Sequence, residues 1–164
     1  MKLYFSLNLL CFAGTALCAA ISVREDNPVP PNFCCFHLRD VISGQNVRQN
    51  SQTGELFLND AILPQGWYCI NQNYDSKVLY DRDNNACIQT SPGNEFQCLD
   101  GTPGGDTWEV ASDGQGPYLK DYGNAVFSIC NVNGRQQVFG PSPPGGLSCQ
   151  MTILRVQDRA GQCK

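Results

Sequence analysis

The sequence predicts an all-β, barrel-like domain that is stabilised by disulfides. Short runs of β-branched and aromatic residues alternate with clusters of Gly, Pro, Asn and Asp, and no useful length of helical periodicity occurs. The chain of 164 residues contains 10 Cys, 16 Gly and 10 Pro, which is typical of exported, cross-linked proteins. Similar residues also return at intervals of 40 or 41, and a fixed interval indicates repeated structural units.

Residues 1–20 are expected to be a secretory signal peptide. Lys2 provides a short basic start, an apolar run extends from Leu3 to Cys18, and the small residues Ala19 and Ala20 precede the expected cleavage site. The apolar run is shorter than the ~20 residues that cross a bilayer core, and no second run follows. We therefore expect secretion of a mature chain that is not membrane-bound. Removing 20 of the 164 residues leaves 144, the length of one domain.

Residues 21–33 contain three Pro and no apolar alternation, so we expect an extended, mobile lead-in before a domain over residues 34–164. Residues with turn preference separate the expected strands, as at Thr53-Gly54, Asp113-Gly114 and Asn133-Gly134. Residues 140–147, rich in Pro and Gly, are expected to form a loop. The expected strands, in order, are Cys34–Leu38, Glu55–Leu58, Trp67–Asn71, Val78–Tyr80, Ala86–Thr90, Glu95–Leu99, Thr107–Ala111, Val126–Asn131, Gln136–Phe139 and Cys149–Val156.

An even number of cysteines follows the signal peptide, and an oxidising compartment would join them in up to four disulfides. The sequence leaves their pairing open, although a bridge from Cys163 to Cys34 or Cys35 would fasten both ends of the domain together. A metal site is not expected, because the chain has no Cys-x-x-Cys pair and only one His. No cofactor is expected either. The eight cysteines are Cys34, Cys35, Cys69, Cys87, Cys98, Cys130, Cys149 and Cys163.

Three columns of similar residues define the repeat. A unit of about 40 residues would supply four short strands, too few to enclose a core, so we expect three units to pack around a common axis. Trp67 and Trp108 also lie 41 residues apart and are expected to be buried in equivalent places. The columns are Leu38-Arg39-Asp40, Leu79-Tyr80-Asp81 and Leu119-Lys120-Asp121; then Leu58, Leu99 and Phe139; then Ile70, Val110 and Met151.

These columns, with Gln65-Gly66-Trp67, resemble the β-trefoil class and the repeat of ricin-B-type lectin domains over residues 34–157. The Gln-x-Trp signature occurs once, since the second unit has Asp106-Thr107-Trp108 and the third has Ser148. The resemblance implies carbohydrate binding. Its aspartates would accept hydrogen bonds from sugar hydroxyls while a tyrosine stacks on the ring, and the matching positions are Asp40, Asp81, Asp121, Tyr80 and Tyr122. The alternative, which we favour, is that each aspartate caps a hairpin by accepting hydrogen bonds from backbone N–H groups.

The signal peptide, the short mature chain, the paired cysteines and the Gly/Asn-rich segments are also similar to small secreted cell-wall and elicitor proteins of filamentous fungi. This resemblance implies a non-catalytic, effector- or elicitor-like protein in the cell wall or the host apoplast. Its partners would be cell-wall glycans or a host surface protein, and we expect a monomer. Nucleic acid is not an expected partner, because the formal net charge is −4.

No catalytic residue is expected. His37, the only imidazole, lies beside cysteines that we expect to be oxidised and therefore not nucleophilic. Asp81, Asp83 and Asn85 have the spacing that begins a calcium loop, but the Gly and Glu that complete such a loop are missing. Besides carbohydrate binding, the alternative function left open is protease inhibition, with Arg82 or Arg135 presented to the protease.

Overall fold

The computed structural model describes residues 27–71, 73, 77–100 and 107–163. The expected signal peptide and residues 21–26 of the expected lead-in lie outside these ranges. All regular secondary structure in the described ranges is β, which confirms the expected all-β class. Among the same residues, no helix has the length and apolar character needed to cross a membrane.

Twelve strands make up the fold, and the ten expected from the sequence each overlap one of them. The two that were not expected are β2, which is only two residues long, and β9, which begins at Gly116-Pro117 and therefore reads as a turn. The strands are β1 (Cys34–Asp40), β2 (Arg48–Gln49), β3 (Leu56–Leu58), β4 (Tyr68–Ile70), β5 (Leu79–Asp81), β6 (Ala86–Gln89), β7 (Phe96–Asp100), β8 (Trp108–Asp113), β9 (Gly116–Asp121), β10 (Val126–Val132), β11 (Arg135–Phe139) and β12 (Cys149–Gly161).

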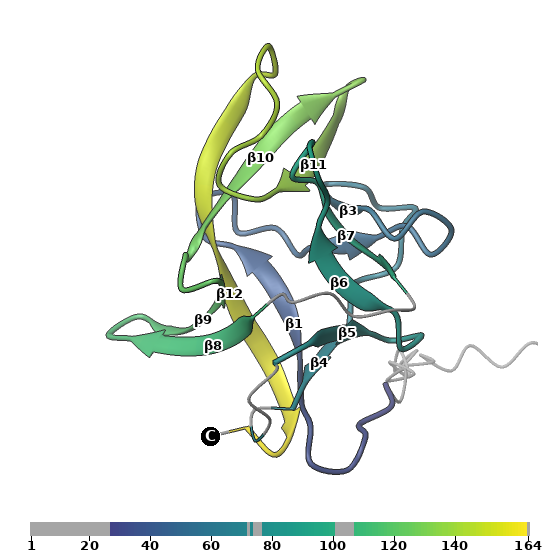
Figure 1. The fold of residues 1–164 in the computed structure, drawn as a ribbon, viewed down its shortest axis with the longest axis vertical. Coiled ribbons are helices and arrows are strands. Elements are labelled where there is room, and N and C mark those ends of the chain that lie inside the picture. Colours follow the sequence, from purple (N-terminus) through teal and green to yellow (C-terminus); the bar gives the residue numbers. More distant parts are fainter. Residues whose placement is uncertain (1–26, 72, 74–76, 101–106, 164) are drawn as a thin grey trace, which may run out of the picture.

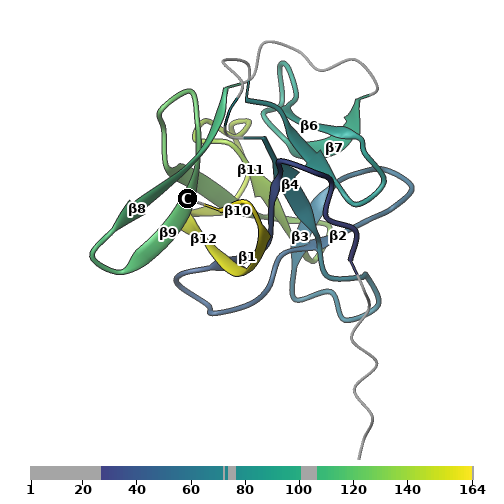
Figure 2. The same ribbon diagram turned by 90° about the horizontal axis from the view of Figure 1, so that it is seen from below.

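The strands form one strongly curled, barrel-like antiparallel sheet (Figures 1 and 2). β1 lies between β12 and β4, β4 pairs with β5, and β12 also pairs with β9, which forms a hairpin with β8. The backbone N–H of Trp108 donates to the carbonyl of Lys77 at 2.9 Å. This bond brings the start of β8 beside the chain that enters β5.

Three hairpins lie mostly above β4, β5, β8 and β9 in Figure 1, and one of them is joined to β5 by the pairing of β5 with β6. They are β2–β3, β6–β7 and β10–β11, and each contacts the next. Glu55 bridges to Gln97, Glu95 bridges to Phe139, and β11 returns to pair with β3. The hairpins therefore meet in a cycle.

The main core contains all three leucines of the first repeat column, Leu38, Leu79 and Leu119, each with no exposed surface. Trp108 is buried among them, and its ring centroid lies 4.8 Å from that of Phe96 in a stacked arrangement. Burying such apolar and aromatic surface is the main stabilising contribution to a fold of this size. The first column therefore behaves as a core column.

The other two columns each contain an exposed member. Leu99 is 48% exposed because its neighbour Cys98 faces inward to pair with Cys87, and successive residues of a strand face opposite sides. Met151 is 70% exposed for the same reason, since Thr152 on the same strand is buried. These two columns are therefore not core columns throughout, contrary to the repeat expected from the sequence.

Four disulfides cross-link the described chain, and such a number is typical of secreted or extracellular proteins. Cys34 pairs with Cys163, which is one of the two pairings expected for Cys163. This bridge ties the start of β1 to the residue two positions after β12. The adjacent Cys35 instead joins β4. The other three bridges connect directly opposed residues of paired strands, namely Cys35–Cys69, Cys87–Cys98 and Cys130–Cys149.

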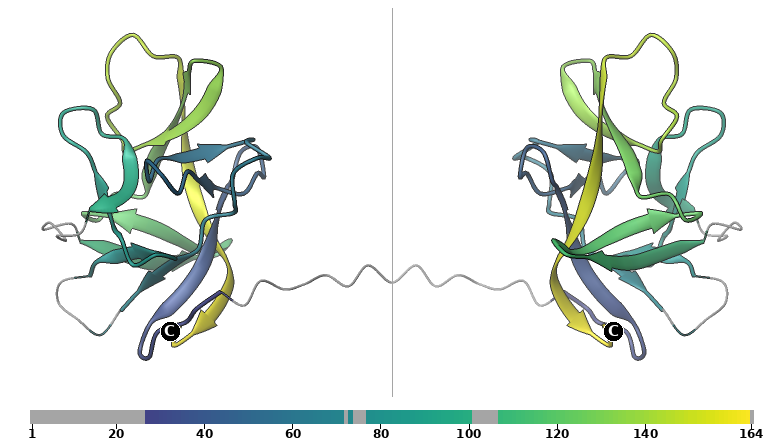
Figure 3. Two further views of the ribbon diagram at one scale, coloured as in Figure 1. Left: turned by 90° about the vertical axis from the view of Figure 1, so that its right-hand side faces the viewer. Right: turned by 90° about the vertical axis from the view of Figure 1, so that its left-hand side faces the viewer.

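Residues 27–33, the described part of the expected lead-in, are bonded to the domain. The carbonyl of Pro28 accepts a hydrogen bond from Nε1 of Trp67 at 2.9 Å, and the carbonyl of Phe33 accepts one from the N–H of Gln162 at 2.8 Å. Trp67 is thereby buried in a small outer cluster with the Cys35–Cys69 bridge, apart from the main core that holds Trp108. Both tryptophans are buried, as expected, but in different surroundings. Figure 3 shows this segment beside the C-terminal end of β12.

Candidate functional site

A groove with a volume of about 330 Å³ lies where three segments of the chain meet. Gln49 and Ser51 come from the β2–β3 hairpin, residues 64–67 come from the segment that enters β4, and residues 81–83 form the turn after β5. We call this the main groove. Its lining residues are Gln49, Ser51, Pro64, Gln65, Gly66, Trp67, Asp81, Arg82 and Asp83.

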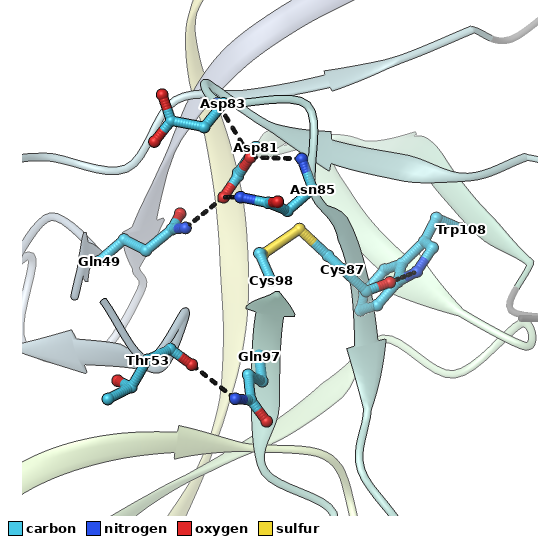
Figure 4. Close-up of a disulfide and its surroundings, with 9 residues drawn as sticks. All are labelled: Gln49, Thr53, Asp81, Asp83, Asn85, Cys87, Gln97, Cys98 and Trp108. Carbon is cyan, nitrogen blue, oxygen red and sulfur yellow. Dashed lines mark hydrogen bonds between the residues drawn. A yellow bond between two sulfur atoms is a disulfide. The ribbon is translucent and has the colours of Figure 1, made fainter. Parts of the chain in front are cut away.

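Asp81 forms part of the groove wall, yet its carboxylate is used within the fold (Figure 4). Oδ1 accepts the backbone N–H groups of Asp83 and Asn85 at 3.0 and 2.8 Å. Oδ2 accepts Nε2 of Gln49 at 2.6 Å and Nδ2 of Asn85 at 3.1 Å. Only 4% of Asp81 is exposed, so this side chain caps the β5–β6 turn and joins it to β2.

Asp40 occupies the corresponding position at the end of β1. Its carboxylate accepts the backbone N–H of Ser43 at 2.6 Å, the hydroxyl of the same residue, and the hydroxyl of Thr152. Burial by itself would raise the pKa of Asp40, but these hydrogen bonds outweigh burial and hold the pKa below its ordinary value. The charged form of Asp40 is therefore part of the folded structure.

Asp121, at the end of β9, completes the set. It is buried, and its backbone N–H donates to the carbonyl of Asn124 at 2.9 Å to close the turn. The backbone N–H groups of Asp40 and Asp81 close their turns in the same way, at 2.9 Å each. The hydrogen bonds of Asp40 and Asp81 agree with the hairpin-cap interpretation of these residues.

The two tyrosines considered as sugar-stacking residues do not line the main groove. Tyr80 directly precedes Asp81 in β5 and therefore faces the opposite side, where its ring centroid lies 6.1 Å from that of Phe33. Tyr122 is 64% exposed and follows Asp121 in its turn. The structure thus does not combine these tyrosines with Asp81 in the main groove.

The accessible groups of the main groove come instead from residues that the sequence did not single out for binding. Asp83 and Ser51 are exposed, and Gln65 is partly exposed. Figure 4 shows the carboxylate of Asp83 pointing away from Asp81. Because these side chains belong to three loops that only folding brings together, no spacing in the sequence could have shown that they share one groove.

The floor of the groove is closely packed. A side chain at Gly66 would collide with the hydroxyl and ring of Tyr68, so only glycine fits here without rearrangement. The Tyr68 ring is fully buried, and burial together with the nearby Asp81 carboxylate raises the pKa of its hydroxyl well above the ordinary value. Tyr68 is therefore neutral and supports the groove from beneath.

His37 packs behind the same wall. Its Nδ1 lies 2.6 Å from the carbonyl oxygen of Gly66, and its ring centroid lies 4.8 Å from that of Trp67 in an edge-to-face contact. The neighbouring Cys34 and Cys35 are both in disulfides, so neither sulfur is a nucleophile that His37 could activate. Within the described ranges, no group of three or more His, Cys, Asp or Glu side chains could hold a metal ion.

Arg135, one of the two arginines considered for protease inhibition, is held in place by its neighbours. Its Nη2 lies 2.6 Å from Oδ2 of Asp60, and its guanidinium lies 3.7 Å from the ring centroid of Phe57. A residue presented to a protease must instead project freely from its loop. The other candidate, Arg82, is exposed at the rim of the main groove.

The chemistry of the main groove is that of a polar binding site. Amide, hydroxyl and carboxylate groups can exchange hydrogen bonds with a ligand, while Pro64 provides apolar surface beside the nearly buried Trp67. Comparisons of the chain with protein-family models, with curated proteins and with solved structures find no match. The function of the groove must therefore be inferred from its own residues.

Proposed function

We propose that this chain is a secreted, non-catalytic protein that acts at a fungal-type cell wall or a host surface, as an effector or elicitor does. Four disulfides and a continuous curled sheet support the proposal, because they make a rigid surface suited to recognition. His37 packs between Trp67 and Gly66, and this packing is consistent with the non-catalytic part of the proposal.

We propose a β-trefoil as the architecture behind this surface. Asp40, Asp81 and Asp121 are spaced 41 and 40 residues apart, and each is the last residue of the first strand of its unit. Each also closes a turn through its backbone N–H. The cyclic contacts among the three hairpins support the same arrangement, since three equivalent units around an axis would place their hairpins together.

The most specific part of the proposal is that the main groove binds carbohydrate. The observation that carries it is the convergence of Gln65, Ser51 and Asp83 on one groove that also has Pro64 in its lining. Sugars present several hydroxyls, each both donor and acceptor, on a ring with apolar faces. A groove that offers mixed polar groups next to the exposed apolar ring of Pro64 matches both properties.

A glycan array tests this proposal with the purified mature protein, residues 21–164. We expect saturable binding to one glycan class, and we expect Asp83→Asn and Gln65→Ala to weaken it. Asp158→Asn is the matched control, because Asp158 is exposed and does not line the groove. Absence of binding to every glycan, or equal loss in the control, would remove carbohydrate as the ligand. Asp81 and Asp40 are unsuitable for this test, since their carboxylates are structural.

A further inference from the structure

A second, smaller pocket of about 180 Å³ lies between the β1–β2 connection and the β3–β4 connection. We call it the amide pocket, because three of its five lining side chains are amides. It shares no lining residue with the main groove. Arg48 and Gln49 are neighbours in β2 and so face opposite sides, one toward each site. The lining residues are Gln45, Asn46, Arg48, Asn59 and Ala61.

Hydrogen bonds hold both walls of the amide pocket. On one side, the backbone N–H of Asp40 donates to the carbonyl of Gln45 at 2.9 Å. On the other side, Nη1 of Arg48 donates to the carbonyl of Leu63 at 2.6 Å. Asn59 has a φ of 56°, a left-handed conformation that Asn tolerates and that fixes the start of this connection. The pocket is thus formed before any ligand arrives, which favours affinity.

The charge of the pocket is positive. Arg48 is the one charged residue in its lining, and Asp60, next in sequence to Asn59, forms an ion pair with Arg135 at 2.6 Å. A guanidinium prefers planar anionic groups such as carboxylates, which accept two parallel hydrogen bonds. The N–H groups of the side-chain amides add further donors. The site therefore favours an anionic acceptor.

One atom of the amide pocket requires a hydrogen-bond donor from the ligand. Oε1 of Gln45 is buried and has no hydrogen-bond partner among the described residues. A buried carbonyl oxygen without a partner carries a cost of about 1–3 kcal/mol, which a ligand donor would remove once the partly exposed Gln45 side chain turns this oxygen toward the pocket. The ligand should therefore carry a hydroxyl close to its anionic group.

We propose that the amide pocket binds one uronic-acid residue, with its carboxylate at Arg48 and the amides and a hydroxyl at Gln45 Oε1. A hexuronate combines these two groups on adjacent parts of one ring. The volume, about 180 Å³, is below the ~300–1,000 Å³ of sites for drug-sized ligands and suits a single sugar residue. The site does not depend on the main groove and would stand if that groove bound nothing.

Titration of the ¹⁵N-labelled mature protein with D-galacturonate tests the proposal by NMR. We expect saturable shifts of the side-chain amide signals of Gln45, Asn46 and Asn59. D-galactose is the matched neutral ligand and should bind about tenfold more weakly or less, because it lacks the carboxylate. A parallel titration with inorganic phosphate distinguishes a site for any small anion from a site for a sugar acid. Phosphate binding as tight as galacturonate binding, or equal binding of galactose, would overturn the proposal.

Two variants locate the ligand. Arg48→Gln should weaken galacturonate binding about tenfold or more, whereas Arg159→Gln, which removes an exposed guanidinium outside the pocket, should leave it unchanged. Asn59→Gly removes one amide and still permits the positive φ, so it serves if Arg48→Gln does not fold. It should weaken binding several-fold while the backbone spectrum stays native. Unchanged affinity in a folded Arg48→Gln or Asn59→Gly variant would refute the site.

Discussion

Replacing Asp81 by Ala should destabilise the fold by about 1.5–5 kcal/mol. The buried Gln49 would lose the acceptor of its side-chain amide, which costs about 1–3 kcal/mol. The turn would also lose the cap that accepts two backbone N–H groups, and loss of a comparable side-chain cap costs about 0.5–2 kcal/mol. At roughly 3 °C for each kcal/mol in a chain of this length, Tm should fall by about 5–15 °C.

Urea unfolding followed by tryptophan fluorescence measures this change with the disulfides intact. Asp83→Ala is the matched control, because Asp83 is exposed and would keep the backbone N–H that it donates to Asp81; it should change stability by less than about 0.5 kcal/mol. Asp81→Asn should fall between the two. If Asp81→Ala were as stable as Asp83→Ala, the carboxylate would not be a structural cap and would be free for a ligand.

Gly66→Ala should cost about 1–3 kcal/mol because the added methyl collides with Tyr68; an unchanged urea midpoint would show that the contact is not tight. Trp108→Ala should cost about 3–5 kcal/mol, and more than Trp67→Ala, because only Trp108 lies in the main core; equal losses in thermal unfolding would contradict this order. Asp40 has a lowered pKa in the folded state, so the stability that it contributes is complete above about pH 5 and is lost as pH falls through that lowered pKa, below about 3.9. Asp40→Asn should flatten this part of the curve of unfolding free energy against pH, and an unaltered slope would assign it to other groups.

The strands were predictable where short apolar runs ended at strong turn residues. β10 and β11, separated by Asn133-Gly134, are an example, because both residues adopt the positive φ that a tight hairpin needs. β9 was not predictable, since Gly116-Pro117 looks like a turn and the strand is defined by its pairing with β8 and β12. Leu99 fitted the repeat by spacing, yet the Cys87–Cys98 bridge decides which face of β7 turns inward.

The site was less predictable than the fold. The capping role of Asp81 followed from its place at a turn, which a sequence pattern can suggest. The partners of that residue are a different matter: Gln49 lies 32 positions earlier and reaches Asp81 only because the curled sheet brings β2 beside the β5–β6 turn. Local patterns carry no information on such long-range contacts. The amide pocket depends in the same way on two connections that meet only after folding.

The Cys34–Cys163 bridge turns nearly the whole described chain into a covalent ring. A protease that cuts once between these two cysteines opens the ring but releases no fragment, because the two pieces stay joined through sulfur. Loss of any piece therefore requires a second cut or a reductant. The nicked protein would keep its full mass on a non-reducing gel and separate only after thiol treatment.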